Sequence, residues 1–296
     1  AEAGYVVYNW LTLVNLSSAA KDFTVYTYDQ TGTLRDTRAV SVLPFGRFDI
    51  DGGHAMLGAS VVGYHEIVPT DAAAPYIAQL IRYGSNANPG ETPSTYLFAF
   101  PLSAQVANGQ YQYVPASRMY NDTTWVELTN ARSEPVTVNV DFYTESGAVT
   151  TRAYALAPHS QLHVEADSTV IGEQAQRYVA IRPTTANSVI AEGMFYHRHP
   201  STGSIMAMYG VPAREALRSS FSGSYNLYLG QINRLALSNV SDTTFSATVA
   251  IRSADGLSSN STSVLLFAHE TTEVTIDSSV MPVDTYGSVT VSTTDS

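Results

Sequence analysis

The chain has 296 residues, a length that suits two or three domains of about 100 residues rather than one ordinary sandwich. Its formal net charge is −11 and its 15 lysines and arginines form no cluster, which argues against partners such as nucleic acids or anionic membranes. The absence of cysteine excludes disulfides and thiol nucleophiles, and no apolar run approaches the roughly 20 residues that a membrane-spanning helix needs.

The first third of the chain predicts a series of short β-strands. Its first apolar run closes on Asn15, and Gly32 follows seventeen residues later, where it would supply the positive φ of a hairpin turn. A turn with the sequence Leu-Pro-Phe-Gly, residues 43–46, opens a further strand. Together these signals predict a unit of about seven strands. The clearest runs lie at residues 10–15, 23–29, 43–50, 76–83 and 96–100.

The same pattern recurs twice further along the chain. Asn130 and Gly147 keep the seventeen-residue spacing in the second unit, and so do Asn239 and Gly256 in the third. The third unit has no counterpart of the last two runs of the other units. Regularly spaced short strands without a 3.6-residue stripe predict β-sandwiches. The runs lie at 125–130, 136–143, 156–164, 189–196 and 204–209 in the second unit, and at 234–239, 245–251, 267–274 and 286–291 in the third.

The predicted fold is therefore all-β, with three tandem Greek-key sandwiches. Residues 1–105 form repeat 1, residues 106–213 form repeat 2, and residues 214–296 form repeat 3, which lacks its last two strands. The order of strand, asparagine turn, strand, glycine, strand, Leu-x-Pro and strand resembles the tandem immunoglobulin-like sandwich repeats of bacterial secreted and surface proteins. That resemblance covers nearly the whole chain, implies stalks, adhesins, envelope layers or extracellular fibres, and carries no catalytic residues.

The incomplete third repeat raises the question of what covers its open side. Three explanations compete: the chain is cut there, the repeat is a reduced capping unit, or a strand from a second molecule fills the gap. Head-to-tail insertion of that kind would propagate a filament. The alternative for the first segment is that residues 4–14 form the first strand or two of repeat 1. The candidate inserting strand is Tyr5, Val6, Val7 and Tyr8, and the candidate open edge is Val289 and Val291.

Few residues indicate chemistry, and we predict no catalytic, cofactor or metal site. Glu192 lies in an apolar run where the first unit has Gln79, which favours a structural hydrogen bond over acid catalysis. His159 and His163 stand near the turn of the second unit, where the first has Phe45 and Asp49, so the repeat itself does not require histidine there. Other weak candidates are the pair His197 and His199 for a metal, the alternating Tyr26 and Tyr28 for surface glycans, and four glycosylation sequons at Asn15, Asn121, Asn239 and Asn260.

We therefore expect a non-enzymatic extracellular or cell-surface protein that acts as a spacer or self-assembles with copies of itself. The start Ala-Glu-Ala-Gly, residues 1–4, fits the end left after removal of a signal peptide, and equally an artificial boundary. The alternatives are an adhesin or carbohydrate-binding module of a larger surface protein, and an appendage protein of a phage or virus.

Overall fold

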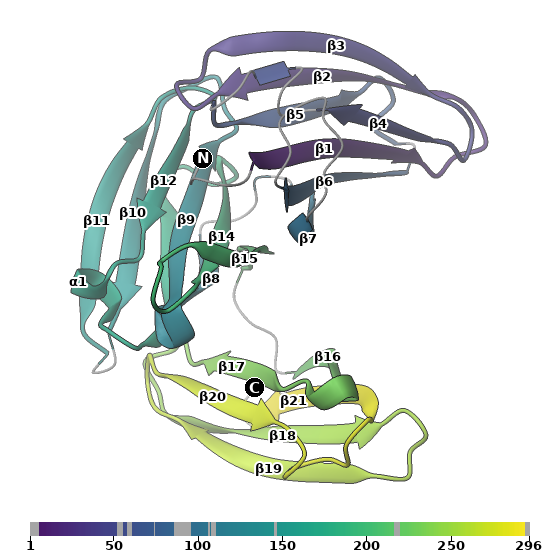
Figure 1. The fold of residues 1–296 in the computed structure, drawn as a ribbon. Helices are drawn as coiled ribbons and strands as arrows, with labels where there is room; N and C mark the ends of the chain where they lie inside the picture. The colour runs from purple at the N-terminus through teal and green to yellow at the C-terminus, as the bar shows by residue number, and fades with distance from the viewer. Residues whose placement is uncertain are drawn as a thin grey trace.

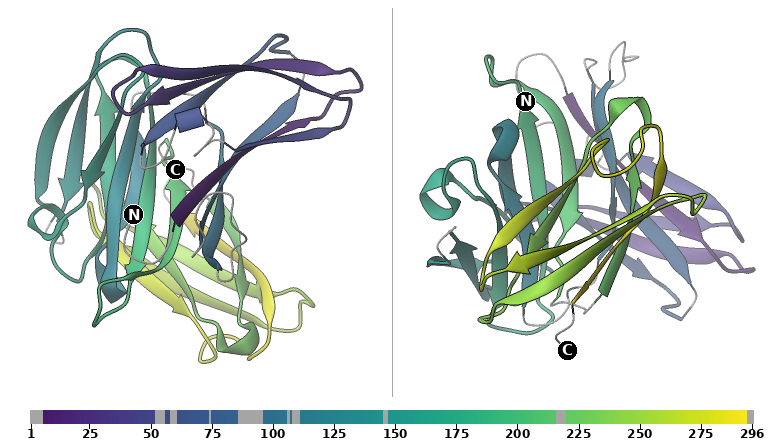
Figure 2. Two further views of the ribbon diagram at one scale, coloured as in Figure 1. Left: turned by 45° about the horizontal axis from the view of Figure 1, so that its top comes forward. Right: turned by 90° about the horizontal axis from the view of Figure 1, so that it is seen from below.

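The computed structural model describes residues 6–51, 56–57, 61–73, 75–85, 96–105, 107, 111–144, 147–215 and 220–293. The protein is all-β, and its three sandwiches follow one another round an open arc (Figure 1). Figure 2 shows the same three bodies from two other directions. Every strand pair is antiparallel, and the pairs fall within residues 6–103, 112–212 and 220–293. The predicted all-β sandwich fold is confirmed.

The first sandwich packs a four-stranded sheet, in the order β4-β1-β6-β7, on a three-stranded sheet, in the order β3-β2-β5. Strands β2 and β3 form a hairpin, whereas β1 and β2 lie in different sheets although they follow each other in the chain. The strands are β1 (Val6–Asn15), β2 (Lys21–Asp29), β3 (Leu34–Val42), β4 (Arg47–Asp51), β5 (Gly63–Pro69), β6 (Tyr76–Ser85) and β7 (Tyr96–Ser103).

The middle sandwich repeats this arrangement and gains an eighth strand, β8, which pairs with β13 at the edge of the second sheet. The seven-strand prediction missed this strand as part of the unit. The sheets have the orders β12-β9-β14-β15 and β11-β10-β13-β8. The elements are β8 (Gln112–Ser117), η2 (Met119–Asn121), β9 (Asp122–Asn130), β10 (Val136–Tyr143), β11 (Val149–Leu156), β12 (Gln161–Glu165), α1 (Ser168–Ile171), β13 (Gln176–Pro183), β14 (Val189–Arg198) and β15 (Ile205–Pro212).

The third sandwich has a four-stranded sheet, in the order β16-β21-β18-β19, and a two-stranded sheet of β17 and β20. Within the described residues it has no counterpart of β14 and β15, in agreement with the prediction that the third repeat lacks its last two strands. The elements are β16 (Ser220–Asn226), η3 (Tyr228–Gly230), β17 (Asn233–Ser238), β18 (Phe245–Ser253), β19 (Ser259–Leu266), β20 (Thr271–Ile276) and β21 (Tyr286–Thr293).

The structure corrects the candidate open edge and places the candidate inserting strand within the first sandwich. Val289 and Val291 lie on β21, which pairs with β16 on one side and β18 on the other, so they are not at an edge. The strand that lacks the second partner of its counterparts among the described residues is β17, because β6 and β14 cover the equivalent side of β1 and β9. Val6, Val7 and Tyr8 belong to β1 and pair with β6, while Tyr5 lies outside the described residues. Val6, Val7 and Tyr8 are therefore part of the first strand of the first sandwich, as in the alternative stated for this segment, and their insertion into a second copy stays a prediction.

A buried asparagine at the end of β1, β9 and β17 ties each sandwich together. Asn15, Asn130 and Asn239 are all fully buried. Each side-chain amide donates to the carbonyl four residues later and to the last two carbonyls before the turn that opens β4, β12 or β20. The acceptors are Ala19, Val42 and Leu43 at 2.7, 3.1 and 3.1 Å, Glu134, Leu156 and Ala157 at 2.8, 3.5 and 2.8 Å, and Thr243, Leu266 and Phe267 at 2.7, 3.2 and 3.0 Å.

This clamp also explains two of the four sequons. Asn15 and Asn239 have serine two residues later because the side-chain oxygen accepts from the backbone N–H and hydroxyl of Ser17 and Ser241. The amide nitrogen that glycosylation would modify is already inside the fold and hydrogen-bonded. These two sequons therefore arise from the structural motif.

Replacing Asn130 with Ala or Asp should lower the free energy of unfolding by about 3 kcal/mol or more, because buried carbonyl oxygens lose their donors. Denaturant unfolding followed by the fluorescence of Trp125, in the same sandwich, measures this change. Asn139→Ala, on β10 of the same sandwich, is the matched control and should stay within about 0.5 kcal/mol. Equal effects of the two substitutions would show that the clamp carries no special share of the stability.

Candidate functional site

The first two sandwiches meet at a histidine turn. His159, in the turn between β11 and β12, stacks on Tyr28 of β2 with ring centroids 4.5 Å apart and planes 6° from parallel. Tyr28 stacks in turn on Tyr64 of β5, whose hydroxyl lies 3.1 Å from Nδ1 of His159. Beside them the backbone N–H of Gln161 donates to the carbonyl of Gln30 at 3.1 Å. We call this contact the first joint.

The second and third sandwiches meet in the same way, at the second joint. His269, in the turn between β19 and β20, stacks on Tyr143 of β10 at 4.9 Å and 20°. Tyr143 stacks on Tyr178 of β13, whose hydroxyl lies 2.9 Å from Nδ1 of His269. The other ring nitrogen, Nε2, lies 2.8 Å from the carboxylate of Asp242. The same three residue types therefore occupy the same three positions at both joints.

The backbone at both joints has matching features. His159 and His269 have positive φ values of 53° and 59°, so each turn projects its imidazole in the same way. The hairpin that receives the turn carries Gly32 or Gly147. A β-carbon at Gly32 would lie 2.1 Å from the carbonyl oxygen of Pro158, so only glycine permits this approach. The glycine of the repeat thus serves the hairpin and the joint.

The tyrosine hydroxyls at the joints stay protonated, because burial raises the pKa of Tyr64 and of Tyr178 above the ordinary value. Each hydroxyl can donate to Nδ1 of its histidine or accept from it, according to the tautomer of the ring. At the second joint Nε2 of His269 also lies 2.8 Å from the carboxylate of Asp242, so both ring nitrogens have a hydrogen-bonding partner there.

Each joint also has a second zone of contact, and these zones differ. At the first joint, β7 packs against β15 through a small apolar core of Phe100, Leu102, Met194 and Met208. At the second joint, the guanidinium of Arg234 lies 3.5 Å from the ring centroid of Tyr120, whose hydroxyl donates to Glu273 at 3.1 Å. The first zone is apolar and the second is polar, so only the histidine and tyrosine contact repeats.

A buried charge cluster crosses the first joint. Glu127 of β9 and Glu192 of β14 stand directly opposite each other in the middle sandwich, and their carboxyl groups share a hydrogen bond. Arg82 of β6 reaches across from the first sandwich, with Nη1 3.6 Å from Oε1 of Glu127. Nε2 of His163 lies 3.6 Å from the same oxygen. The cluster therefore joins one cation of the first sandwich to two carboxyl groups of the second.

The two carboxyl groups differ in protonation. Burial, reinforced by the charge of Glu127, raises the pKa of Glu192 to about 8. Although burial opposes it, the charge of Arg82 lowers the pKa of Glu127. Near neutral pH Glu192 therefore holds a proton and donates it in a hydrogen bond to the Glu127 carboxylate, which pairs with Arg82.

Sequence reasoning identified part of this site. Glu192 was expected to make a structural hydrogen bond, but its partner Glu127 was missed because it lies on a strand distant in sequence. The repeat does not require histidine at position 159, and Tyr28 is a candidate for glycan contact, whereas the structure brings the two side chains together. A histidine at the turn in the second and third units, together with a tyrosine thirteen residues after Asn15 and Asn130, was the signal available.

The remaining chemical candidates are dispersed. His197 lies 3.0 Å from Asp122, and His199 bonds within its own turn. Among the residues that the structure describes, no three histidine or acidic side chains gather as a metal site. In the same residues no helix is long and apolar enough to cross a membrane.

The histidine and tyrosine of each joint should be energetically coupled. In a double-mutant cycle, Tyr178→Phe and His269→Ala should show a coupling of about 1 kcal/mol, because either change breaks the same hydrogen bond. Thermal or denaturant unfolding measures the coupling, and Tyr64→Phe with His159→Ala should repeat the result. Tyr154→Phe, a half-buried tyrosine of β11, should be additive with His269→Ala. If the effects of Tyr178→Phe and His269→Ala were additive, the hydrogen bond assigned between the two side chains would be refuted.

Glu192 should make the stability fall as pH rises. Its folded pKa is above the ordinary value of 4.5, so the folded chain binds more protons than the unfolded chain between about pH 4.5 and 8. Stability from this group is present below that window and is lost on passing through it, by an amount on the order of a few kcal/mol. Glu192→Gln mimics the protonated form and should flatten this part of the curve of melting temperature against pH. Glu134→Gln, at an exposed position, should leave the curve unchanged, and a wild-type slope retained in Glu192→Gln would contradict the assignment.

Comparison with known proteins adds no further constraint. Neither protein-family models nor curated protein sequences give a match to the chain. The two joints and the buried charge cluster are therefore the features from which a function has to be argued.

Proposed function

We propose that the protein is a non-enzymatic structural protein, a curved and stiff spacer of β-sandwiches that works outside the cell. The observation that carries the proposal is the repetition of one joint, with the same histidine and two tyrosines, at both boundaries between sandwiches. A chain of loosely linked binding modules would not need the same buried contact twice. Repeated contact fixes the orientation of each sandwich on the last, which is the property a spacer requires.

The buried charge cluster supports stiffness and gives no support to catalysis. Glu127 is 3% exposed at its side chain and Arg82 is 15% exposed, so the ion pair is closed from solvent. Removing one partner of such a buried ion pair lowers the stability of the folded protein by several kcal/mol, because the charge of the other partner is left buried and unpaired. Opening the first joint would expose that ion pair and separate it, so the two sandwiches are held at a fixed angle.

The composition supports a place outside the cell. Only 14% of the residues are charged, so neutral groups make up much of the surface. Such surfaces suit close lateral packing against neighbouring molecules more than long-range steering of a charged ligand. We propose this localisation together with the spacer role.

The spacer role predicts a single narrow distribution of distances between the first and the third sandwich. Because the chain lacks cysteine, Ser41→Cys on β3 and Ser263→Cys on β19 give two unique sites for spin labels. Pulsed electron resonance should give one narrow distribution, and adding Tyr143→Ala with His269→Ala should broaden it. Tyr154→Phe is the control that should leave it narrow. A broad distribution in the otherwise unchanged chain would sink the spacer proposal.

A further inference from the structure

One turn and one receiving face of the repeat have no mate within the described residues. Phe45 occupies the position of His159 and His269, with the same positive φ, here 51°. Asn15 holds this turn as the other asparagines hold theirs. Phe45 is 70% exposed and its neighbour Leu43 is 72% exposed, whereas the two joint histidines are half-buried. The first sandwich thus presents an apolar version of the joint turn to solvent.

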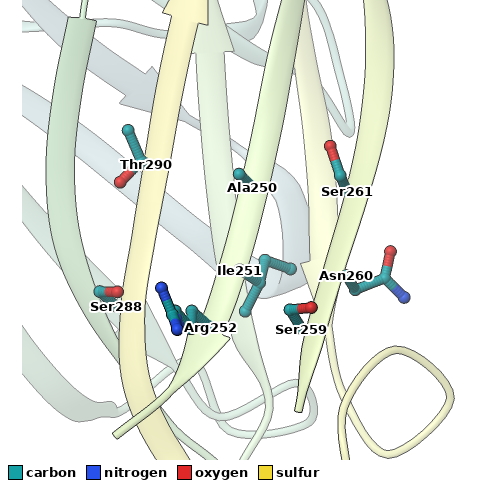
Figure 3. Close-up of a pocket in the computed structure, with 8 residues that line it drawn as sticks. All are labelled: Ala250, Ile251, Arg252, Ser259, Asn260, Ser261, Ser288 and Thr290. Atoms are coloured by element: carbon teal, nitrogen blue, oxygen red, sulfur yellow. The ribbon is translucent and has the colours of Figure 1, made fainter. Parts of the chain in front are cut away.

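The third sandwich presents the matching face in altered form. On the third sandwich Arg252 and Ser288, which stand opposite each other on β18 and β21, occupy the positions of Tyr143 and Tyr178. Small side chains surround Arg252, and they leave a hollow of about 430 Å³ on the outer face of the sheet (Figure 3). The lining residues are Ala250, Ile251, Arg252, Ser259, Asn260, Ser261, Ser288 and Thr290.

The two ends complement each other. At the internal joints the receiving face brings two aromatic rings and the turn brings a polar imidazole, whereas here the turn brings the ring and the face brings a cation. A guanidinium over a phenyl ring is a favourable pair. Arg252 also lies against Gly256, 3.5 Å from where a β-carbon would stand, and Gly256 is the counterpart of the glycine that meets Pro158 at the first joint.

Neighbouring residues fit the same docking. Leu257, next to Gly256, is 85% exposed and would be covered together with Leu43. Arg47 occupies the place of Gln161, which contacts Gln30 at the first joint, and Asp255 follows the residue equivalent to Gln30. The Phe45 turn therefore brings Arg47, which pairs with Asp49 at 2.9 Å, toward the side where the receiving hairpin carries Asp255.

We propose that the Phe45 turn of one molecule docks on the Arg252 face of a second copy of this chain, as a third joint of the internal kind. This inference rests on the proposed spacer function and names its partner. The contact is heterologous, because different surfaces of the two copies meet, so it can be repeated from copy to copy. Depending on the rotation at each step, the product is a ring or a filament, built without exchange of strands.

Cysteine cross-linking tests the proposed contact directly. Leu43→Cys with Leu257→Cys places one thiol on each side of the third joint, and a short bis-maleimide should convert the protein into a ladder of covalent multimers. An equimolar mixture of the two single variants should stop at dimers. The reach of the reagent is checked by Ala157→Cys with Thr33→Cys, the equivalent pair across the first joint, which should close within one molecule.

Sedimentation velocity over a concentration series tests the residues. Phe45→Ser and Arg252→Ser should each weaken association by at least about tenfold, since each removes the ring or the cation of the pair. The combination Phe45→His, Arg252→Tyr and Ser288→Tyr rebuilds the internal trio and should restore association. Tyr154→Phe, on β11 of the middle sandwich and outside both surfaces, is the control and should associate as the unchanged chain does.

The outcomes separate this inference from the proposed function. A monomer at all concentrations that forms no interchain cross-link, while the Ala157→Cys and Thr33→Cys pair closes, overturns the docking and leaves a stiff spacer standing. Strong dimers of the Leu43→Cys single variant would also overturn it, because they would show two identical turns meeting. A broad end-to-end distance distribution in the monomer would instead remove the spacer proposal itself.

Discussion

The buried asparagine clamp is the interaction on which the rest of the structure depends. One amide at the end of β1, β9 or β17 holds the turn just after it and the turn that opens the paired strand, so it ties two loops that are far apart in sequence. The second of these turns carries Phe45, His159 or His269. A residue whose first task is to satisfy buried carbonyls therefore also sets the direction in which each joint residue points.

The difference between Gln79 and Glu192 shows how one fold position can be adapted to an interface. Both stand in equivalent central strands, but Glu192 faces Glu127 and the incoming guanidinium of Arg82, while Gln79 faces Thr12. A protonated carboxyl group keeps the hydrogen-bonding capacity of an amide and adds the option of ionising. The middle sandwich therefore carries a titratable carboxyl group, Glu192, at its contact with the first sandwich. The strand that bears it, β14, has the same place in its sheet as β6, which bears Gln79.

The fold could be predicted from the sequence and the joints could not. The spacing from asparagine to glycine and the alternating runs depend on contacts within a unit, and period-2 patterning reports these directly. Tyr28, Tyr64 and His159 come from three strands or turns in two units, so no local pattern joins them. The missing runs follow residues 286–291 in the chain and so predict an open edge at β21. Strand order in a sandwich does not follow chain order, however, and the strand that lacks the second partner of its counterparts is β17.

The joint gives each sandwich a polarity. The turn that docks and the hairpin that receives lie at opposite ends of the same unit, so a duplicated unit brings both halves of a working contact with it. Duplication or loss of a unit would then change the length of the arc in whole steps, without new surfaces having to evolve. Because the two tyrosines and the histidine of one joint contact one another, substitutions at these three positions should arise together. Positions that form no joint within the molecule, such as Phe45 and Arg252, are free to change independently of them.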